Sequence, residues 1–174
     1  MVEMEEESSL RNDSRAKTYD AAGRPLGFVA GGGTTALICE EDEARRGKIS
    51  SRMRASGYQT REPASAREAL ANMRFHLYDV VIVNEAFDRS DQEVCPVLSY
   101  LESLAMATRR QIFVALLSDT YRTADNMVAF VKSVNIIIST QDLDEVDKII
   151  AQSKADNEAF YHVFKESMVK AGKI

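Results

Sequence analysis

Polar side chains follow four short apolar runs in this chain, at positions where they could do chemistry. They are Glu40 and Glu41, Asn84, Ser118, and Thr140. A pair of neighbouring carboxylates could hold a hydrated Mg²⁺ weakly, or simply favour the positive end of the following helix. An asparagine amide has no anionic oxygen, and its nitrogen lone pair is delocalised, so Asn84 is not a competent nucleophile. The residue types therefore predict a polar site without a reactive group.

The apolar runs that carry these residues are typical of strands buried on both faces. Val80–Val83 is four β-branched apolar residues without alternation, which is the pattern of a parallel strand between helix layers. Further apolar runs lie at 36–39, 112–117 and 136–138, a short strand without an apolar run is expected at 58–60, and helical segments separate these strands. Strands that alternate with helices predict βαβ units. We expect an α/β fold, a flavodoxin-like doubly wound five-stranded parallel sheet of order 2-1-3-4-5 with helices on both faces.

The helical segments have apolar stripes at helical spacing. Ser65 and Glu68 predict a capping box at the start of the second helix. The third helix is expected to carry its apolar stripe from Val94 to Ala105, with Pro96 in its first turn. The fifth helix is expected to bury Leu143, Val146, Ile149 and Ile150. The fourth helix is expected to turn Ala124, Met127, Val128 and Val131 inward.

An extra C-terminal helix is expected to begin near Asp156 or Asn157. Its stripe comprises Phe160, Val163, Phe164 and Met168. Because water contact is unfavourable for two phenylalanines, this stripe must rest on something. We expect it to fold back onto the module's own surface, with a second chain as the alternative.

Composition divides the chain into three parts. Residues 1–33, which are acidic at the start and rich in glycine at the end, predict a flexible tail or linker. Residues 34–153 form the expected domain, and 154–174 a helical extension. The glycines at 31–33 do not make a phosphate loop, because they precede a strand and no lysine follows.

The net charge of −5 argues against nucleic acid as a partner, since phosphate binding needs a basic surface. Without a secretory segment or a long apolar segment, the chain is expected to be cytoplasmic and not membrane-bound. Cys39 and Cys95 have no metal-ligand spacing, and Cys39 is expected in the core. His76 and His162 are expected to be surface or helix-end residues.

The carboxyl ends of strands 1, 3, 4 and 5 converge on one crevice in the expected fold, and the polar residues named above lie there. Over roughly residues 35–152 this arrangement resembles the receiver domain of bacterial response regulators. Four segments carry the resemblance: Leu37–Glu43, Tyr78–Asn84, Ala115–Ser118 and Ile138–Thr140. The Gly-rich lead-in and Asn157–Tyr161 resemble receiver-like modules at the C-termini of bacterial zinc-ribbon proteins.

The resemblance assigns a family role to each crevice position. Glu40 and Glu41 stand at the acidic pair, Ser118 stands at the switch hydroxyl, Asn84 replaces the phosphoacceptor aspartate and Thr140 replaces the invariant lysine. Ile137 stands where the family usually has an aromatic ring. Acceptor, positive charge and ring are therefore all missing from their family positions.

These departures predict a degenerate receiver, not an enzyme, which binds a protein partner in bacterial signalling. It is expected to be monomeric and to need no cofactor, with weak Mg²⁺ binding left open. Two alternatives remain. One is a phosphorylatable receiver with a displaced acceptor, either Glu85, which should point away from the crevice, or Asp88 in the loop. The other is a flavodoxin-type small-ligand module, although the acidic residues at 40–43 would repel a phosphate.

Overall fold

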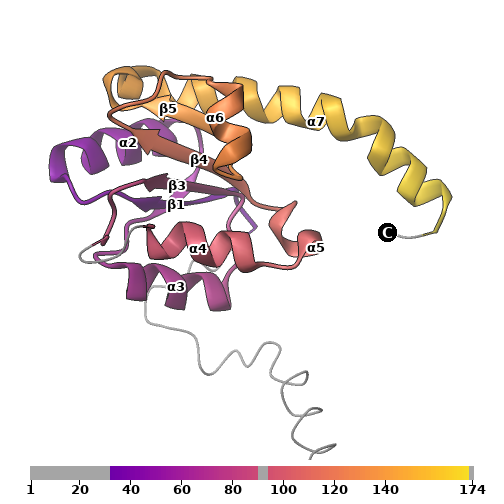
Figure 1. The fold of residues 1–174 in the computed structure, drawn as a ribbon, viewed down its shortest axis with the longest axis horizontal. Helices are drawn as coiled ribbons and strands as arrows, with labels where there is room; N and C mark the ends of the chain where they lie inside the picture. Colours follow the sequence, from indigo (N-terminus) through magenta and orange to yellow (C-terminus); the bar gives the residue numbers. More distant parts are fainter. Residues whose placement is uncertain (1–31, 90–93, 173–174) are drawn as a thin grey trace, which may run out of the picture.

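A five-stranded parallel sheet of order β2-β1-β3-β4-β5 organises the computed structural model (Figure 1). The structure describes residues 32–89 and 94–172, so the tail predicted over 1–33 falls almost entirely outside it. The strands are β1 (Thr35–Cys39), β2 (Gln59–Arg61), β3 (Val80–Asn84), β4 (Phe113–Ser118) and β5 (Ile136–Ser139). The predicted fold class and strand order are confirmed.

Helices occupy both faces of this sheet. They are α2 (Glu43–Ala55), α3 (Ala66–Phe75), α4 (Pro96–Ser103), α5 (Met106–Arg109), α6 (Asn126–Val131), the 3-10 helix η2 (Thr140–Glu145) and α7 (Val146–Lys170). Side chains cap several of them: Asp42 accepts from the Arg45 amide and Ser65 from the Glu68 amide. The Ser65 half of the predicted capping box is therefore present, whereas the Glu68 carboxylate accepts from the amide of Ala64 instead of that of Ser65.

Strict alternation along the strands divides the core into two layers. Leu37, Val81 and their counterparts face α3, α4 and α6. Ile38, Ile82 and their counterparts face α2 and the first turns of α7. The central strands are buried along their whole length because both faces are covered, which explains their unbroken apolar runs.

The fourth helix, α6, turns different side chains toward the core than the sequence predicted. Met127 and Val131 are each 73% exposed, whereas Ala129 is buried and Val128 packs against the core. The reason is the helix start: Asp125 caps at the Val128 amide, and Ala124 stands outside the helix with φ of 61°. A six-residue helix starting there turns Val128 and Ala129 toward the sheet.

The predicted third helix is divided in two. Leu104 and Ala105 have extended backbone conformations, with ψ of 143° and 139°, so α4 ends at Ser103 and α5 begins at Met106. Leu104 still packs against the core, and the division lets the chain turn toward β4. Val94 is 49% exposed and therefore lies outside the buried stripe.

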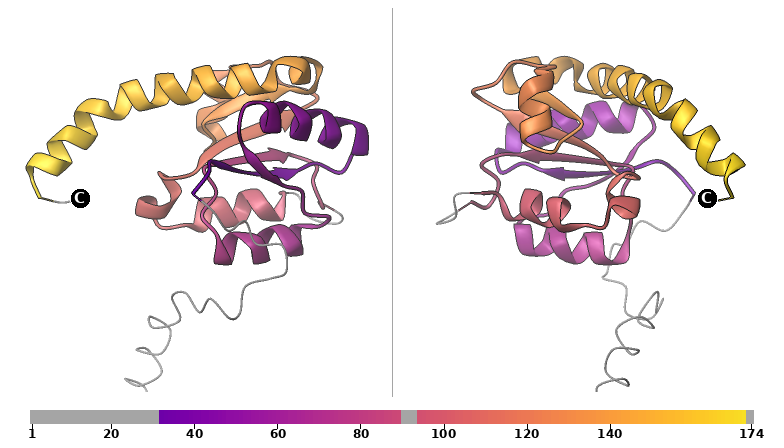
Figure 2. Two further views of the ribbon diagram at one scale, coloured as in Figure 1. Left: turned by 180° about the vertical axis from the view of Figure 1, so that it is seen from behind. Right: turned by 45° about the vertical axis from the view of Figure 1, so that its right-hand side comes forward.

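No break separates a fifth from a sixth helix, because α7 is one continuous helix of 25 residues. Such a helix is about 37 Å long, whereas strands of four to six residues span about 13–20 Å. Its second half therefore projects beyond the sheet (Figures 1 and 2). The expectation that its stripe packs on the module is wrong for Phe160 and Val163, which are 78% and 70% exposed.

None of the helices in the described ranges has both the length and the apolar character needed to cross a membrane.

Candidate functional site

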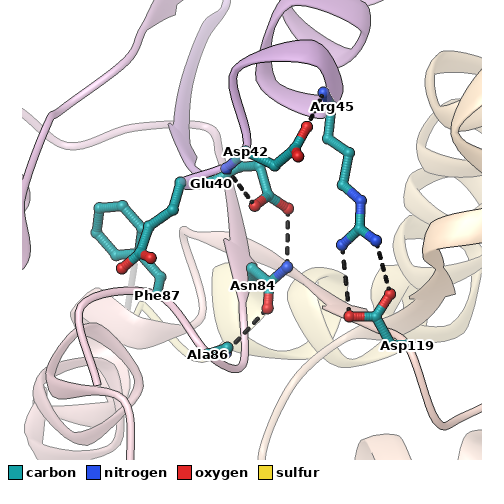
Figure 3. Close-up of a pocket in the computed structure, with 8 residues that line it drawn as sticks. Glu40, Asp42, Arg45, Asn84, Ala86, Phe87 and Asp119 are labelled. Carbon is teal, nitrogen blue, oxygen red and sulfur yellow. Dashed lines mark hydrogen bonds and ion pairs between the residues drawn. The ribbon is translucent and has the colours of Figure 1, made fainter. Parts of the chain in front are cut away.

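The predicted crevice exists at the carboxyl edge of the sheet, between the ends of β1, β3 and β4. It has a volume of about 240 Å³ (Figure 3). Its lining comprises Glu40, Glu41, Asp42, Arg45, Asn84, Ala86, Phe87 and Asp119. Parallel strands bring their carboxyl ends to one edge, so residues separated by more than forty positions meet here. Four of the eight lining residues are acidic and one is basic.

A hydrogen bond between Asn84 and Glu40 lies at the centre of the crevice. The Asn84 amide nitrogen donates to Glu40 Oε2 at 2.8 Å, and both residues are buried. Glu40 Oε1 accepts from the Asp42 amide at 3.0 Å, and Asn84 Oδ1 accepts from the Ala86 amide at 2.9 Å. The expectation that Asn84 would bind Ser118 or Glu41 is wrong, because β3 pairs directly with β1 and places Glu40 closer.

The second acidic residue, Glu41, holds the loop that follows β3. Its Oε1 accepts from the Asp88 amide at 2.6 Å, and the Asp88 carboxylate accepts from the Ala66 amide at 2.7 Å. Asp88 therefore caps the start of α3 while its own backbone, at φ of 46°, is fixed by Glu41. The acidic pair is structurally engaged, and so is the carboxylate of Asp88.

Ser118 is fully buried at the end of β4 and has three hydrogen-bond partners. Its hydroxyl accepts from the amides of Thr120 and Tyr121 at 3.0 and 3.2 Å, the local backbone role expected of a strand-end hydroxyl. It donates to Glu85 Oε1 at 2.6 Å. Glu85 does not line the crevice, in agreement with strand alternation, but its carboxylate closes the neighbouring turn.

Thr140 contributes through a residue that the sequence prediction missed. Its hydroxyl donates to Asp119 Oδ1 at 2.6 Å, and Asp119 forms an ion pair with Arg45 at 3.0 Å. Hydrogen bonds from Thr140 and Arg45 lower the pKa of Asp119, and the bond to Asp119 raises the pKa of Arg45. The sequence could have indicated Arg45 as a site residue by its position. It lies three residues after the helix cap Asp42, in the first turn of α2 at this edge of the sheet.

A positive charge is therefore present in the crevice, although Thr140 cannot supply one. Arg45 reaches across from α2 to Asp119, beyond the end of β4 (Figure 3). A guanidinium paired with a carboxylate in this way is already neutralised. Arg45 therefore lines the site as one half of an ion pair with Asp119.

The donor set does not fit a bound Mg²⁺, the metal that the resemblance implies. Both oxygens of Glu40, one oxygen of Glu41 and the oxygen of Asn84 already accept N–H donors. Mg²⁺ requires oxygen ligands in near-octahedral geometry, and the amide nitrogen of Asn84 points at Glu40 where a cation would have to lie. Within ranges 32–89 and 94–172, no group of three or more metal-ligating side chains occurs.

Three solved structures are similar to this one. The receiver domain of a Francisella response regulator gives a TM-score of 0.55 at 16% identity, covering 71% of this chain and 98% of that one. A DNA-binding response regulator of the LuxR family from Staphylococcus aureus gives a TM-score of 0.53 at 15% identity, and the match covers 69% of this chain and 98% of that one. An orphan response regulator of Helicobacter pylori gives a TM-score of 0.51 at 19% identity, and the match covers 70% of this chain and 94% of that one. The chain has the fold of a response regulator receiver domain.

At these identities the likeness concerns the receiver fold alone. No protein-family model matches the chain, and no curated protein matches its sequence. The functional residues of this receiver fold must therefore be judged on their own geometry.

The remaining titratable candidates lie away from the crevice or inside the core. His76 caps the C-terminus of α3, and its Nε2 lies 3.0 Å from the Thr35 hydroxyl; His162 is exposed on α7. Cys39 and Cys95 are both buried, and burial raises the pKa of each thiol. The two cysteines are core residues of the receiver fold, as expected for Cys39.

The ion pair of Asp119 leads to a prediction about its titration. Because Thr140 and Arg45 stabilise the carboxylate, the pKa of Asp119 lies below the usual aspartate range. Its stabilising contribution is therefore present above that range and is lost as the pH falls through the lowered pKa. Thr140→Val should raise the pKa of Asp119 toward its ordinary value, as measured by ¹³C carboxyl NMR.

Asp144 provides the internal control for this titration. Its pKa is lowered by Lys48, on a different part of the surface, and should not change in Thr140→Val. An unchanged Asp119 pKa in the variant would mean that Thr140 does not hold this carboxylate.

Proposed function

We propose that this chain is a receiver-like signalling domain that cannot be phosphorylated and that acts by binding a protein partner. The observation that carries the proposal is the hydrogen bond from the Asn84 amide to Glu40. At the position that resembles a phosphoacceptor, the side chain has no nucleophilic oxygen and its amide is held within the fold. The receiver fold of the similar structures supports the signalling class.

The crevice works as a fixed structural element in this proposal. In a phosphorylatable receiver, an acidic cluster and a cation receive a phosphoryl group whose charge must be neutralised. Here the Asn84 amide takes the cation's place as the partner of Glu40, and Arg45 is paired with Asp119. We infer that the domain has one crevice conformation, needs no cofactor and catalyses no reaction.

A phosphorylatable receiver with a displaced acceptor is the second candidate. Glu85 is its best acceptor, because its carboxylate lies 2.6 Å from the Ser118 hydroxyl, at the switch position. Against it, Glu85 does not line the crevice, and Asp88 is committed to the Ala66 amide. A flavodoxin-type phosphate site is disfavoured by the acidic residues around the start of α2.

The proposed partner surface is the face formed by α6, β5 and the first half of α7. Three large apolar side chains of α6 lie open there: Met127, Phe130 and Val131 are 73%, 82% and 73% exposed. Contiguous exposed apolar groups on a small domain are typical of protein-interaction sites. The fold class suggests a partner from a bacterial signalling pathway in the cytoplasm, bound by a monomeric domain.

Phosphorylation chemistry tests the first half of the proposal. The wild-type chain should acquire no phosphoryl group from a small phosphodonor with Mg²⁺, measured by intact-mass spectrometry. Asn84→Asp alone should also stay unlabelled, because Thr140 leaves the added charge uncompensated. Asn84→Asp combined with Thr140→Lys is the positive variant, and we expect detectable labelling at residue 84.

A phosphoryl adduct on the wild-type chain would contradict the proposal. Glu85→Gln and Asp88→Asn would then identify which carboxylate accepts it, and loss of the adduct in either variant would establish the second candidate. Efficient labelling of Asn84→Asp alone would show that Thr140 is not limiting.

Partner capture tests the second half. Residues 34–174, used as bait in extracts of the native cell, should retain a specific protein, identified by mass spectrometry. Phe130→Ser should abolish the capture because it removes the most exposed apolar side chain of α6. Leu77→Ser, at a partly exposed apolar site next to α3, is the matched control and should retain it. Equal capture by both variants would exclude this surface.

A further inference from the structure

The carboxyl end of β1 extends beyond β2, its neighbour in the sheet. β1 pairs with β2 over Thr35–Leu37, whereas its pairing with β3 continues to Cys39. The Thr34 carbonyl accepts from the Gln59 amide of β2 at 2.9 Å. Because successive residues of a strand alternate in direction, the carbonyl of Glu40 faces the same side, where β2 has already ended. A donor from outside the sheet must therefore satisfy this buried carbonyl.

Arg46 supplies this donor from α2. Its Nη1 donates to the Glu40 carbonyl at 3.0 Å and to the Glu41 carbonyl at 3.1 Å. One nitrogen thus holds two successive peptide groups, which are those of the acidic pair. Arg46 is not among the residues that line the crevice, so it acts on the acidic pair from outside the site.

A carboxylate directly after β2 holds the Arg46 side chain in place. Glu62 Oε2 lies 3.9 Å from Arg46 Nε. Glu62 Oε1 accepts from Arg54 Nη2 at 2.8 Å and from the hydroxyl of the buried Ser50. The Ser50 hydroxyl also lies 3.0 Å from that of Thr60 in β2. This network joins α2 to the end of β2 and fixes the Arg46 guanidinium beside the strand end.

The two peptide groups that Arg46 holds determine where the Glu40 side chain points. Both carboxylate oxygens of Glu40 are engaged, one with the Asp42 amide and one with the Asn84 side chain. Hydrogen bonds weaken steeply when their distance and angle depart from the optimum. A rotation of the Glu40 peptide group would therefore cost at least one of the two bonds.

We propose that Arg46 is a positioning residue for the hydrogen bond between Asn84 and Glu40. It contacts the main chain of Glu40 and Glu41 and thereby keeps the buried carboxylate aimed at the Asn84 amide. The inference rests on the proposed function, in which the crevice has a single arrangement, and it names the residue that maintains that arrangement.

Exchange of the Asn84 side-chain amide, followed by NMR on the full chain, tests the proposal. The signal is assigned by its loss in Asn84→Asp. The backbone amide of Val81, in the buried centre of β3, is the reference for global stability. Arg46→Gln should raise the ratio of the Asn84 rate to the Val81 rate about fivefold, because the carboxylate is no longer held in place. The variant should fold, since Glu62 keeps Arg54 and Ser50 as partners.

The reference amide separates positioning from a general loss of stability. The Asp42 amide donates to the other Glu40 oxygen, so its exchange should accelerate together with that of Asn84. A merely structural role for Arg46 would accelerate exchange at Asn84 and Val81 by the same factor. That result would overturn the proposal.

Arg54→Gln is the matched control. Arg54 lies on the same helix and pairs with the same Glu62, but it donates to the Thr60 hydroxyl instead of the strand end. The control should leave the ratio unchanged, and an equal rise in Arg54→Gln and Arg46→Gln would overturn the proposal. Arg46→Lys should keep the slow exchange of Asn84, because one ammonium group can donate to both carbonyls, as Nη1 does.

Failure of this inference and failure of the proposed function give different results. A phosphoryl adduct on the wild-type chain would contradict the proposed function, whatever the exchange rates are. An unchanged ratio in Arg46→Gln, in a chain that acquires no phosphoryl group, would overturn the role of Arg46 alone.

Discussion

Burial of the Glu40 carboxylate is the constraint on which the crevice depends. A charged group removed from water must be compensated by hydrogen bonds or an opposite charge. Glu40 is 3% exposed and takes one bond from the Asp42 amide and one from the Asn84 side chain. Asn84 is therefore a structural partner, because it supplies the donor that makes a buried carboxylate tolerable without a cation.

The neighbouring interactions have the same character. Glu41 fixes the Asp88 loop, and Ser118 joins Glu85 to the turn after β4. Thr140 and Arg45 together hold Asp119. Each polar group that could serve phosphoryl chemistry is instead engaged in a hydrogen bond or an ion pair within the fold.

The sequence predicted the sheet well because the signal is carried by buried strands. Val80–Asn84 has the same unbroken burial that its composition indicated, and the position of Glu40 and Asn84 at one edge followed from parallel topology. The side-chain contacts among the residues at the carboxyl edge of the sheet were less predictable. Asn84 prefers Glu40 over Ser118, and Arg45 enters the crevice from a helix, because side-chain reach and helix phase decide these contacts rather than strand order.

The helices departed from prediction where local signals compete. α6 begins at a cap that periodicity alone did not locate, which turns Met127 and Phe130 to the surface. α7 continues past the sheet because nothing between Val146 and Lys170 interrupts it. Both departures place large apolar side chains in contact with solvent.

Thermal unfolding of the wild type and Asn84→Asp, with and without Mg²⁺, tests the central claim most directly. If the Asn84 amide replaces a cation, the variant places two carboxylates in contact and loses a donor, at a cost of about 1–3 kcal/mol. For a chain of this size, that lowers the Tm by about 2–4 °C per kcal/mol. Millimolar Mg²⁺ should restore the Tm of the variant and leave the wild type unchanged, while Asn126→Asp, the same charge change at an exposed site, should show neither effect. A wild type that Mg²⁺ stabilises as much as the variant, or a variant that is no less stable without Mg²⁺, would contradict the account.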